Sequence, residues 1–309
     1  MLSSRMPELT ALQVLVTVAR SPSLNAAAKA LGVSQQAVSA RVAGLESLVG
    51  VPLILRTRQG ISMTKAGSTV AEWAHRLLDV AAELDSGLAT LRDDGQAHIR
   101  IAASLTIAEH LLPGWLVGVR SPGRPNPEIQ VVATNSDQVL ELLRAGEVDL
   151  GFVEKPGVLT DVRSRTVARD ELVVVVPPGH PWTRRGFVLD AHLLADTAIV
   201  SRETGSGTRE ALLHALRRVE GPGFRLRPAL MSLSSTTAVR AAVAAGAGPA
   251  VLSRLAVDED VRAGRLVEIP LPGVDLRRAL RAAWVGGSAP PAGVARDLVA
   301  HLGSRRPTA

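Results

Sequence analysis

The chain has no cysteine and no tyrosine among its 309 residues, and aromatic residues make up only 2% of it. Without cysteine, disulfide bonds, thiol catalysis and cysteine-ligated zinc or iron–sulfur centres are excluded. With so few aromatic rings, the hydrophobic cores must consist mainly of Leu, Val, Ile and Ala. The chain also lacks an uncharged apolar run of about 18 residues, so no membrane-spanning helix is expected.

What is present is the composition of a soluble globular protein, with 46% apolar and 21% charged residues. At about 150 residues per domain, the length predicts about two domains, each large enough to bury a core. The apolar segment 11–19 follows Arg5 and so resembles a signal peptide in outline. Glu8 and Gln13 interrupt that pattern, and four apolar side chains fall on one helical face. We therefore expect a folded helix and a cytoplasmic protein.

Positive charge is concentrated at one end of the chain. The net charge is +6, and residues 1–67 hold seven cationic side chains and two carboxylates, a net +5 that leaves +1 for the other 242 residues. A basic block of this kind indicates contact with nucleic acid or another acidic surface. Codon bias is the alternative, since Arg outnumbers Lys 32 to 3. Bias explains the choice of Arg over Lys, but it does not explain why this segment has so few acids.

The first 50 residues predict three helices in a compact order. Apolar periodicity predicts a helix over 10–20, and Ser23 and Ser34 are N-caps for helices over 24–31 and 35–50. A short helix, a glycine turn and a helix with polar residues at its start is the arrangement that enters a major groove. Two solvated helices with an alanine-rich contact are the alternative, and periodicity alone leaves both open.

The side chains around the third helix suit base and phosphate contacts. Gln bonds adenine bidentately, Arg forks onto guanine, and Ser suits a base or a phosphate. Short strands on either side of the basic turn 56–60 predict a wing that contacts the minor groove and phosphates, although an ordinary surface hairpin has the same pattern. The candidate DNA-contacting residues are Ser23, Ser34, Gln35, Gln36, Ser39, Arg41, Arg56 and Arg58.

A long helix, capped by Thr64 and ending near Arg92, is predicted next. Its apolar residues recur in alternating steps of four and three, which is a heptad seam. Packing along its own domain would also explain the seam, but pairing of two chains is favoured directly after a DNA-binding head. Residues 93–96 form the expected hinge. The predicted dimerisation residues are Val70, Ala74, Leu77, Ala81, Leu84, Leu88 and Leu91.

The remaining residues alternate strand and helix, which predicts an α/β fold with one wound parallel sheet or two small ones. Small polar residues stand at the strand-to-helix turns, where such folds bind ligands. Hydroxyl groups and free N–H groups at helix starts favour a carboxylate or phosphate. Each residue taken alone is more often a structural N-cap, and it is their clustering at every turn that favours binding. The segment GSGTR at 205–209 matches neither a P-loop nor a dinucleotide-binding loop.

Positions in the first 67 residues match a known motif in order and spacing, without a gap. They are Leu9, Leu12, Val18, Ala19, Ser23, Ala27, Ala28, Leu31, Val33, Ser34, Gln35, Ala37, Val38, Ser39, Leu45, Glu46, Gly50, Leu53, Arg56, Thr64, Ala66 and Gly67. The pattern resembles the winged helix-turn-helix of LysR-type transcriptional regulators. That resemblance implies dimerisation through the long helix that follows.

The C-terminal region resembles the effector domain of the same family, which is folded like the type-2 periplasmic binding proteins. The segments SLTIAEHLLP, LLRAGEVDLGFVE, VVVVPPGHP, SRETGSGTRE and AAGAGPAVLS carry this resemblance. It implies a helix-turn-helix domain over 1–67, a linker helix over 68–95 and an effector domain over 96–309. Within the effector domain it implies two α/β subdomains, 97–172 with 271–309 and 173–270. By analogy, the effector contacts are Ser104, Thr106, Asn135, Ser201, Thr204 and Ser234.

The sequence thus predicts a DNA-binding transcriptional regulator, not an enzyme, controlled by a small anionic effector and without a cofactor or metal. The implied partners are double-stranded promoter DNA, the effector, further copies of the chain in a homodimer or homotetramer, and RNA polymerase, with no membrane. An enzyme is a second hypothesis, but the chain has no GxSxG or HExxH motif and its seven His are scattered. A solute-binding transport component is a third, which leaves the basic N-terminal segment and the heptad seam unexplained.

Overall fold

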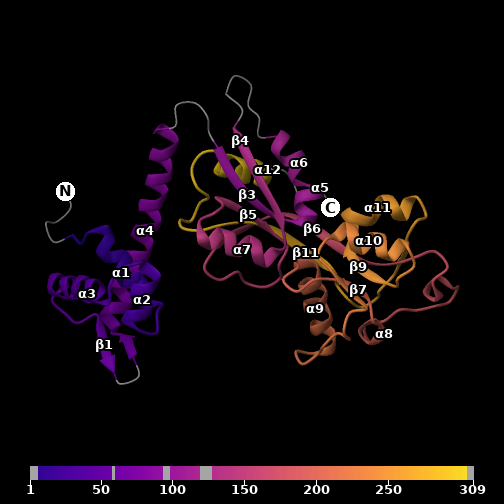
Figure 1. The fold of residues 1–309 in the computed structure, drawn as a ribbon, viewed down its shortest axis with the longest axis horizontal. Helices are drawn as coiled ribbons and strands as arrows, with labels where there is room; N and C mark the ends of the chain where they lie inside the picture. The colour runs from indigo at the N-terminus through magenta and orange to yellow at the C-terminus, as the bar shows by residue number, and fades with distance from the viewer. Residues whose placement is uncertain (1–5, 58–59, 93–97, 119–126, 305–309) are drawn as a thin grey trace. The chain divides into compact units, whose positions relative to one another are not determined.

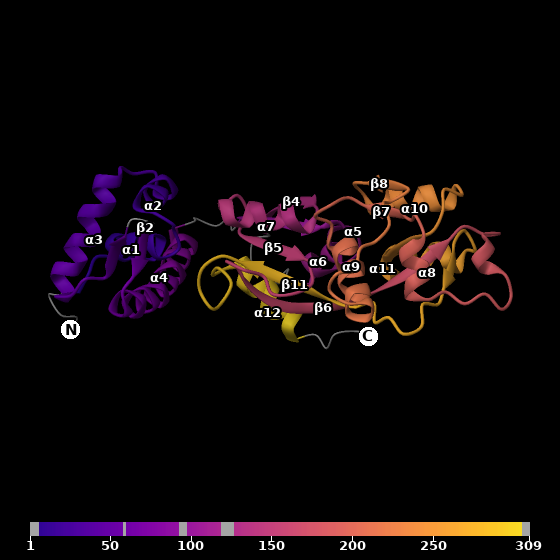
Figure 2. The same cartoon turned by 90° about the horizontal axis from the view of Figure 1, so that it is seen from below.

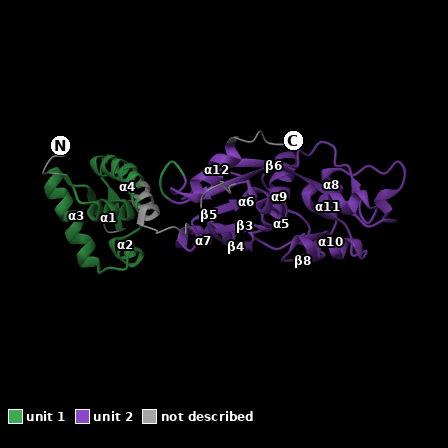
Figure 3. Ribbon diagram, turned by 90° about the horizontal axis from the view of Figure 1, so that it is seen from above, with its two compact units in different colours: residues 1–88, 286–289 green, residues 89–285, 290–309 purple. Residues whose placement is uncertain are grey.

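A computed structural model describes residues 6–57, 60–92, 98–118 and 127–304 of the chain. The chain forms two compact units, residues 1–88 with 286–289 and residues 89–285 with 290–309 (Figure 3). In the described ranges, no helix has the length and apolar character needed to cross a membrane. We describe each unit by itself.

Unit 1 is a helical domain with a small hairpin (Figure 1). All three predicted short helices and the predicted long helix are present, with boundaries within one residue of the expected ones. Ser23 and Ser34 act as the predicted N-caps, accepting hydrogen bonds from Ala26 N and Ala37 N, and Gly32 ends the second helix in the left-handed conformation. The elements are α1 (Leu9–Ala19), α2 (Leu24–Leu31), α3 (Gln35–Val49), β1 (Ile54–Thr57), β2 (Gly60–Met63) and α4 (Lys65–Arg92).

Unit 2 has one nine-stranded sheet in the order β4-β3-β5-β11-β6-β9-β7-β8, with β10 also paired to β6. The sheet is mixed, whereas the sequence predicts parallel strands. Its outer strands are parallel within each half, but β11 and β6 run antiparallel to their neighbours and join the halves. The strands are β3 (His98–Ser104), β4 (Glu128–Thr134), β5 (Leu150–Val153), β6 (Arg163–Val176), β7 (Val200–Arg202), β8 (Met231–Leu233), β9 (Ala250–Ser253), β10 (Val267–Ile269) and β11 (Arg277–Trp284).

Helices cover both faces of this sheet. In the first half, which contains β3, β4 and β5, α7 packs on one face and α5, α6 and α12 on the other (Figure 2). In the second half, which contains β7, β8 and β9, α8 and α9 share one core and α10 and α11 another. The helices are α5 (Leu105–His110), α6 (Leu112–Val117), α7 (Ser136–Ala145), α8 (Ala191–Asp196), α9 (Gly207–Glu220), α10 (Thr236–Ala244), α11 (Arg254–Arg262) and α12 (Val294–Ser304).

Strand β6 is longer than the sequence indicates. Hydrophobicity predicts a strand only from Glu171, because the preceding residues 163–170 are rich in Arg and have one Asp. The apolar part continues to Val176, and its alternate side chains enter the cores on opposite sides of the sheet, so it is apolar throughout. The predicted subdomain division near residue 172 therefore falls within one continuous strand, and it stays a prediction.

Candidate nucleic-acid interface and effector site

The start of α3 presents polar side chains to solvent. Gln35, Gln36 and Arg41 are exposed, whereas Val38 is fully buried in the core of unit 1. Ser34 is exposed too, and its oxygen accepts the hydrogen bond from Ala37 N at 3.2 Å. A hydroxyl that accepts in this way keeps its own proton for a further acceptor. The chemistry predicted for base and phosphate contact is therefore accessible at this end of the helix.

The other two predicted DNA-contacting residues near α2 and α3, Ser23 and Ser39, are less exposed to solvent. Ser23 is half-buried, and its oxygen accepts a hydrogen bond from Ala26 N at 3.1 Å. Ser39 is half-buried and has an interaction of its own. Both stand on the helices expected at the DNA, but their local roles are at least partly structural.

The predicted wing is a two-stranded hairpin. Arg56 lies in β1, where its backbone pairs with Ile61, and Arg58 lies outside the described residues. The hairpin is tied to α3 by Glu46, whose Oε1 accepts hydrogen bonds from Leu53 N at 2.7 Å and from Ile54 N at 3.1 Å. The sequence pattern includes Glu46 but does not indicate this role, because the bond joins residues seven and eight positions apart outside any repeat.

The predicted seam of α4 has two environments. Ala74 is buried in the core of unit 1, with Val70 and Leu77 packed against it and against α1. Ala81 is half-buried, and Leu91 has no described side chain. Among the described side chains of the predicted set, Leu84 and Leu88 are exposed, and two large apolar residues outside the set are exposed with them. We call these four the exposed stripe: Trp73, Val80, Leu84 and Leu88.

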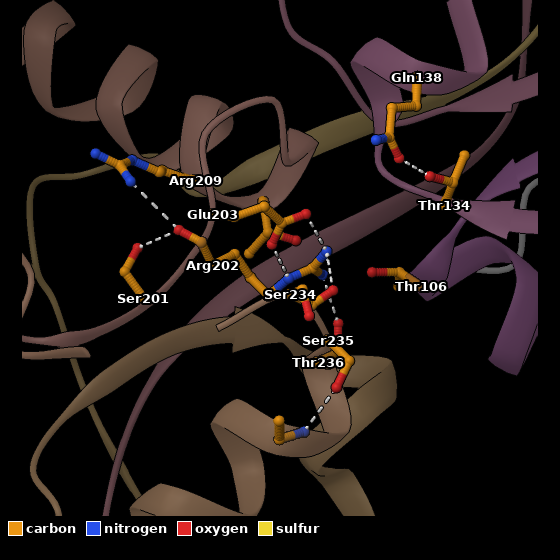
Figure 4. Close-up of polar contacts among 12 residues, drawn as sticks. Thr106, Thr134, Gln138, Ser201, Arg202, Glu203, Arg209, Ser234, Ser235 and Thr236 are labelled. Atoms are coloured by element: carbon orange, nitrogen blue, oxygen red, sulfur yellow. Dashed lines mark hydrogen bonds and ion pairs between the residues drawn. The ribbon is translucent and has the colours of Figure 1, made fainter. Parts of the chain in front are cut away.

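The six predicted effector residues come from both halves of unit 2. Ser104 and Thr106 stand at the start of α5 and are fully buried, and Asn135 caps α7 by accepting from Gln138 N at 3.0 Å. In Figure 4, the Thr106 side chain points toward the group around Arg202 and Ser234.

The second-half members of the set have other contacts. Ser201 donates to the carbonyl of Arg202 at 3.1 Å, and Ser234 uses its own carbonyl to accept from the buried Arg202 guanidinium at 3.3 Å. Thr204 is exposed. These three residues lie in or just after the paired strands β7 and β8, and the bonds of Ser201 and Ser234 to Arg202 stabilise the ends of these strands.

A buried polar network joins the two halves. Arg278 Nη2 lies 2.8 Å from Glu154 Oε2 and 2.7 Å from Asp170 Oδ2, and all three residues are buried. Thr106 and Thr208 each donate to Glu154 at 3.3 Å. One guanidinium thus faces two buried carboxyl groups. We call Glu154, Asp170 and Arg278 the central triad.

A second set of contacts crosses the same junction. Lys155 pairs with Asp137 at 2.5 Å and with Glu210 at 3.3 Å. Burial by itself would lower the pKa of Lys155, but these two carboxylates outweigh burial and leave its pKa above the ordinary value. Gly207 allows close packing here, because a Cβ on it would lie 2.5 Å from Glu154 Cγ. The GSGTR segment is therefore a packing element of the junction.

Two buried hydroxyl groups at the junction have no hydrogen-bond partner in the described part of the chain. They belong to Ser104 and Ser206, which are the N-cap residues of α5 and α9 and are each 1% exposed. Neither hydroxyl caps its own helix. Ser206 is not among the six residues carried over from the family, although it stands in the polar cluster that the sequence shows there. A buried hydroxyl without a partner needs a specific explanation, and a bound ligand is one.

The architecture is that of a helix-turn-helix regulator with a separate α/β ligand-binding unit. Residues 9–68 match the family model of bacterial regulatory helix-turn-helix proteins of the lysR family, and residues 92–306 match the LysR substrate binding domain. The chain belongs to the LysR family of transcriptional regulators.

Sequence relatives and solved structures support the same family assignment. An uncharacterised HTH-type transcriptional regulator of Mycobacterium tuberculosis is 51% identical over 308 residues, covering 98% of this chain and 99% of its own. Full-length OxyR from Pseudomonas aeruginosa is 25% identical, with a TM-score of 0.56 over 96% of this chain and 100% of that one. CbnR, solved in complex with its target DNA, shares the fold at 22% identity and a TM-score of 0.50, over 96% of this chain and 98% of that one.

Proposed function

We propose that the protein binds promoter DNA through α3 and the β1–β2 hairpin and that a small anionic effector between the halves of unit 2 controls it. The observation that carries the DNA-binding part is the exposed polar start of α3 within a winged helix-turn-helix. CbnR, a protein of the same fold, has been solved with its target DNA. Since its proposed target is chromosomal promoter DNA, we expect the protein in the cytoplasm, with RNA polymerase as its partner at a promoter.

The DNA-binding part of the proposal is tested by whether the protein retards some DNA sequences in a gel more strongly than others. In a gel-shift screen of genomic fragments, the full chain should select a subset of fragments. Gln35→Ala should reduce the preference for the best site by about 1–3 kcal/mol, the value of one bidentate base contact. Lys29→Ala changes an exposed residue of α2 and is the control. It should weaken binding to all fragments by a similar factor. Equal retardation of every fragment by the unmodified protein would contradict the proposal.

The effector part rests on Ser104 and Ser206. Their hydroxyl groups come from opposite halves of unit 2, are buried and have no acceptor in the described residues. Ser206 stands at the start of the fourteen-residue α9, whose free N–H groups favour a negative group. A carboxylate or phosphate accepts hydrogen bonds from both kinds of donor. An effector held by residues of both halves also fixes how the halves are arranged, which couples its binding to DNA binding.

Thermal-shift screening with metabolite acids tests the effector part. A ligand that binds only the folded protein raises the melting temperature by mass action. Ser104→Ala should reduce this shift in melting temperature without altering DNA binding in the absence of ligand. Ser232→Ala, in the exposed strand β8, is the control and should leave the shift unchanged. Thr106→Ala is harder to interpret, because it also removes hydrogen bonds to Glu154 and Arg278 of the central triad. Stabilisation by neutral or cationic compounds alone would contradict the anionic effector.

A further inference from the structure

A cavity of about 290 Å³ lies in unit 2, and its wall does not include the six predicted effector residues. It is lined by α9, by the residues that follow β5, by Thr166 of β6, and by β11 with the residues just before it. Glu154 and Arg278 are part of its wall, so it adjoins the central triad. None of Ser104, Thr106, Asn135, Ser201, Thr204 or Ser234 lines it.

Cationic side chains outnumber carboxylates in this wall. Lys155, Arg218, Arg277, Arg278 and Arg281 line the cavity with only Glu154 and Asp275 opposed to them. Some of this charge is compensated, because Arg278 faces the triad carboxylates and Lys155 faces Asp137 and Glu210.

The remaining charge is positive. Arg277 pairs with Asp275 at 2.8 Å. This pairing, with a smaller contribution from the nearby Arg218, lowers the pKa of Asp275 to about 2. The single carboxylate of Asp275 thus faces two guanidinium groups of the cavity wall, and Arg281 on β11 adds a third cation.

Arg281 is the cation best placed to bind an anion. Its Nη1 donates to the carbonyl of Gly157 at 2.8 Å and its Nη2 donates to the carbonyl of Lys155. In the part of the chain that the structure describes, its Nε has no acceptor and no carboxylate pairs with it. The two carbonyls orient the guanidinium without neutralising its charge. Burial lowers the pKa of Arg281, since desolvation disfavours its charged form.

We propose that this cavity is a second ligand site, distinct from the proposed effector site, which binds a small molecule carrying a carboxylate or phosphate group. Arg281 anchors the oxyanion, and Arg218 and Arg277 in the same wall supply further charge. An orientated arginine fork binds planar oxyanions bidentately, and an anion offsets the desolvation of the buried charge. Since α9 belongs to the second half of unit 2 and the residues after β5 to the first, an occupied site links the halves.

Calorimetric titration of the full chain tests this site. Inorganic phosphate and succinate are the two probes, each compared with sodium chloride at the same ionic strength, so that phosphate and carboxylate recognition are distinguished. At least one probe should bind saturably. Arg281→Gln should weaken that binding by about tenfold or more, the value of a charge-assisted hydrogen bond. Arg218→Gln, an exposed change at the end of α9, should weaken it several-fold.

Arg185→Gln is the matched control, because it removes the same charge from an exposed loop of the same unit. It should leave probe binding unchanged. The proposal is overturned if neither probe binds saturably, or if both cavity variants bind as the Arg185→Gln control does. Circular dichroism melts show that each variant is folded, and the exposed Arg218 variant keeps the test decisive if Arg281→Gln does not fold. DNA is absent from these titrations, so their result does not depend on promoter binding.

Discussion

At the scale of single residues, the central triad buries three ionisable side chains inside unit 2, which is energetically costly. Two carboxylates and one guanidinium are removed from water, and Arg278 forms the link between them. Removing one member of a buried ion pair costs several kcal/mol, because the partner that stays behind is left as an uncompensated buried charge. Thr106, Thr208 and Ser253 supply the additional hydrogen bonds that such a group requires.

Arg278→Met should destabilise unit 2 by about 3–5 kcal/mol, since it leaves Glu154 and Asp170 buried without a cation. Urea unfolding measures this loss. Trp115 and Trp284, both in the core of the first half, report on it by fluorescence. Arg277→Met is the control, because solvent screens its exposed pair with Asp275 and the change should therefore alter stability little. Adding Glu154→Gln to Arg278→Met should recover part of the loss. A loss no larger than that of the control would mean that the carboxylates do not depend on Arg278.

At the scale of elements, α4 serves two purposes along its length. Its early apolar residues complete the core of unit 1, so they are not available to a second chain. The exposed stripe begins at Trp73 and continues beyond the part of the helix that packs on α1. An exposed apolar stripe on a long helix indicates a partner helix, and we propose that a second copy of the chain supplies it.

Leu84→Asp should therefore dissociate the oligomer. Leu84 is 63% exposed within one chain, and burying such a side chain against a partner contributes about 1.5–3 kcal/mol. A carboxylate in the stripe removes that contribution and adds the cost of burying a charge. Light scattering measures the mass of the variant in solution. Ser68→Asp, an exposed change elsewhere on α4, should leave the mass unchanged. An intact oligomer with Leu84→Asp would place the interface on another element.

At the scale of the whole molecule, charge and ligand binding are divided between the units. Nearly all of the net positive charge belongs to residues 1–67, whereas the cavity and the central triad belong to unit 2. A DNA contact made by the first segment releases counterions in proportion to the phosphates it neutralises. Salt dependence therefore reports on unit 1 separately from effector binding.

The double variant Arg56→Ala with Arg58→Ala should weaken binding to all DNA sequences similarly. It should also reduce the slope of log affinity against log salt by about 1.8 per head, since each phosphate contact contributes about 0.9. Fluorescence anisotropy over a range of salt concentrations measures the slope. Arg184→Ala with Arg185→Ala removes the same charge from unit 2 and is the control. If both double variants keep the original slope, the hairpin makes no phosphate contact.

Local sequence determined much of unit 1. Ser23, Ser34 and Gly32 fix the ends of α2 and α3 through bonds that span only a few residues, so caps and apolar periodicity were enough to predict them. The family resemblance is also a property of the sequence alone, and the family models confirm it. In unit 2, most strands and helices followed from periodicity, but the Arg-rich beginning of β6 did not, because its buried Asp170 is compensated by a residue elsewhere in the chain.

Only the tertiary structure decided which groups meet. Thr106 and Arg278 are 172 positions apart, and Arg278 and Asp170 are 108 apart, so no spacing rule connects them. The sequence likewise gives α4 a continuous seam, and packing against α1 decides which part of it is buried. Arg281 is one of 32 arginines in the sequence. Its position between two carbonyls beside a cavity depends on the pairing of β11 with β5 and β6, a long-range arrangement that local chemistry does not encode.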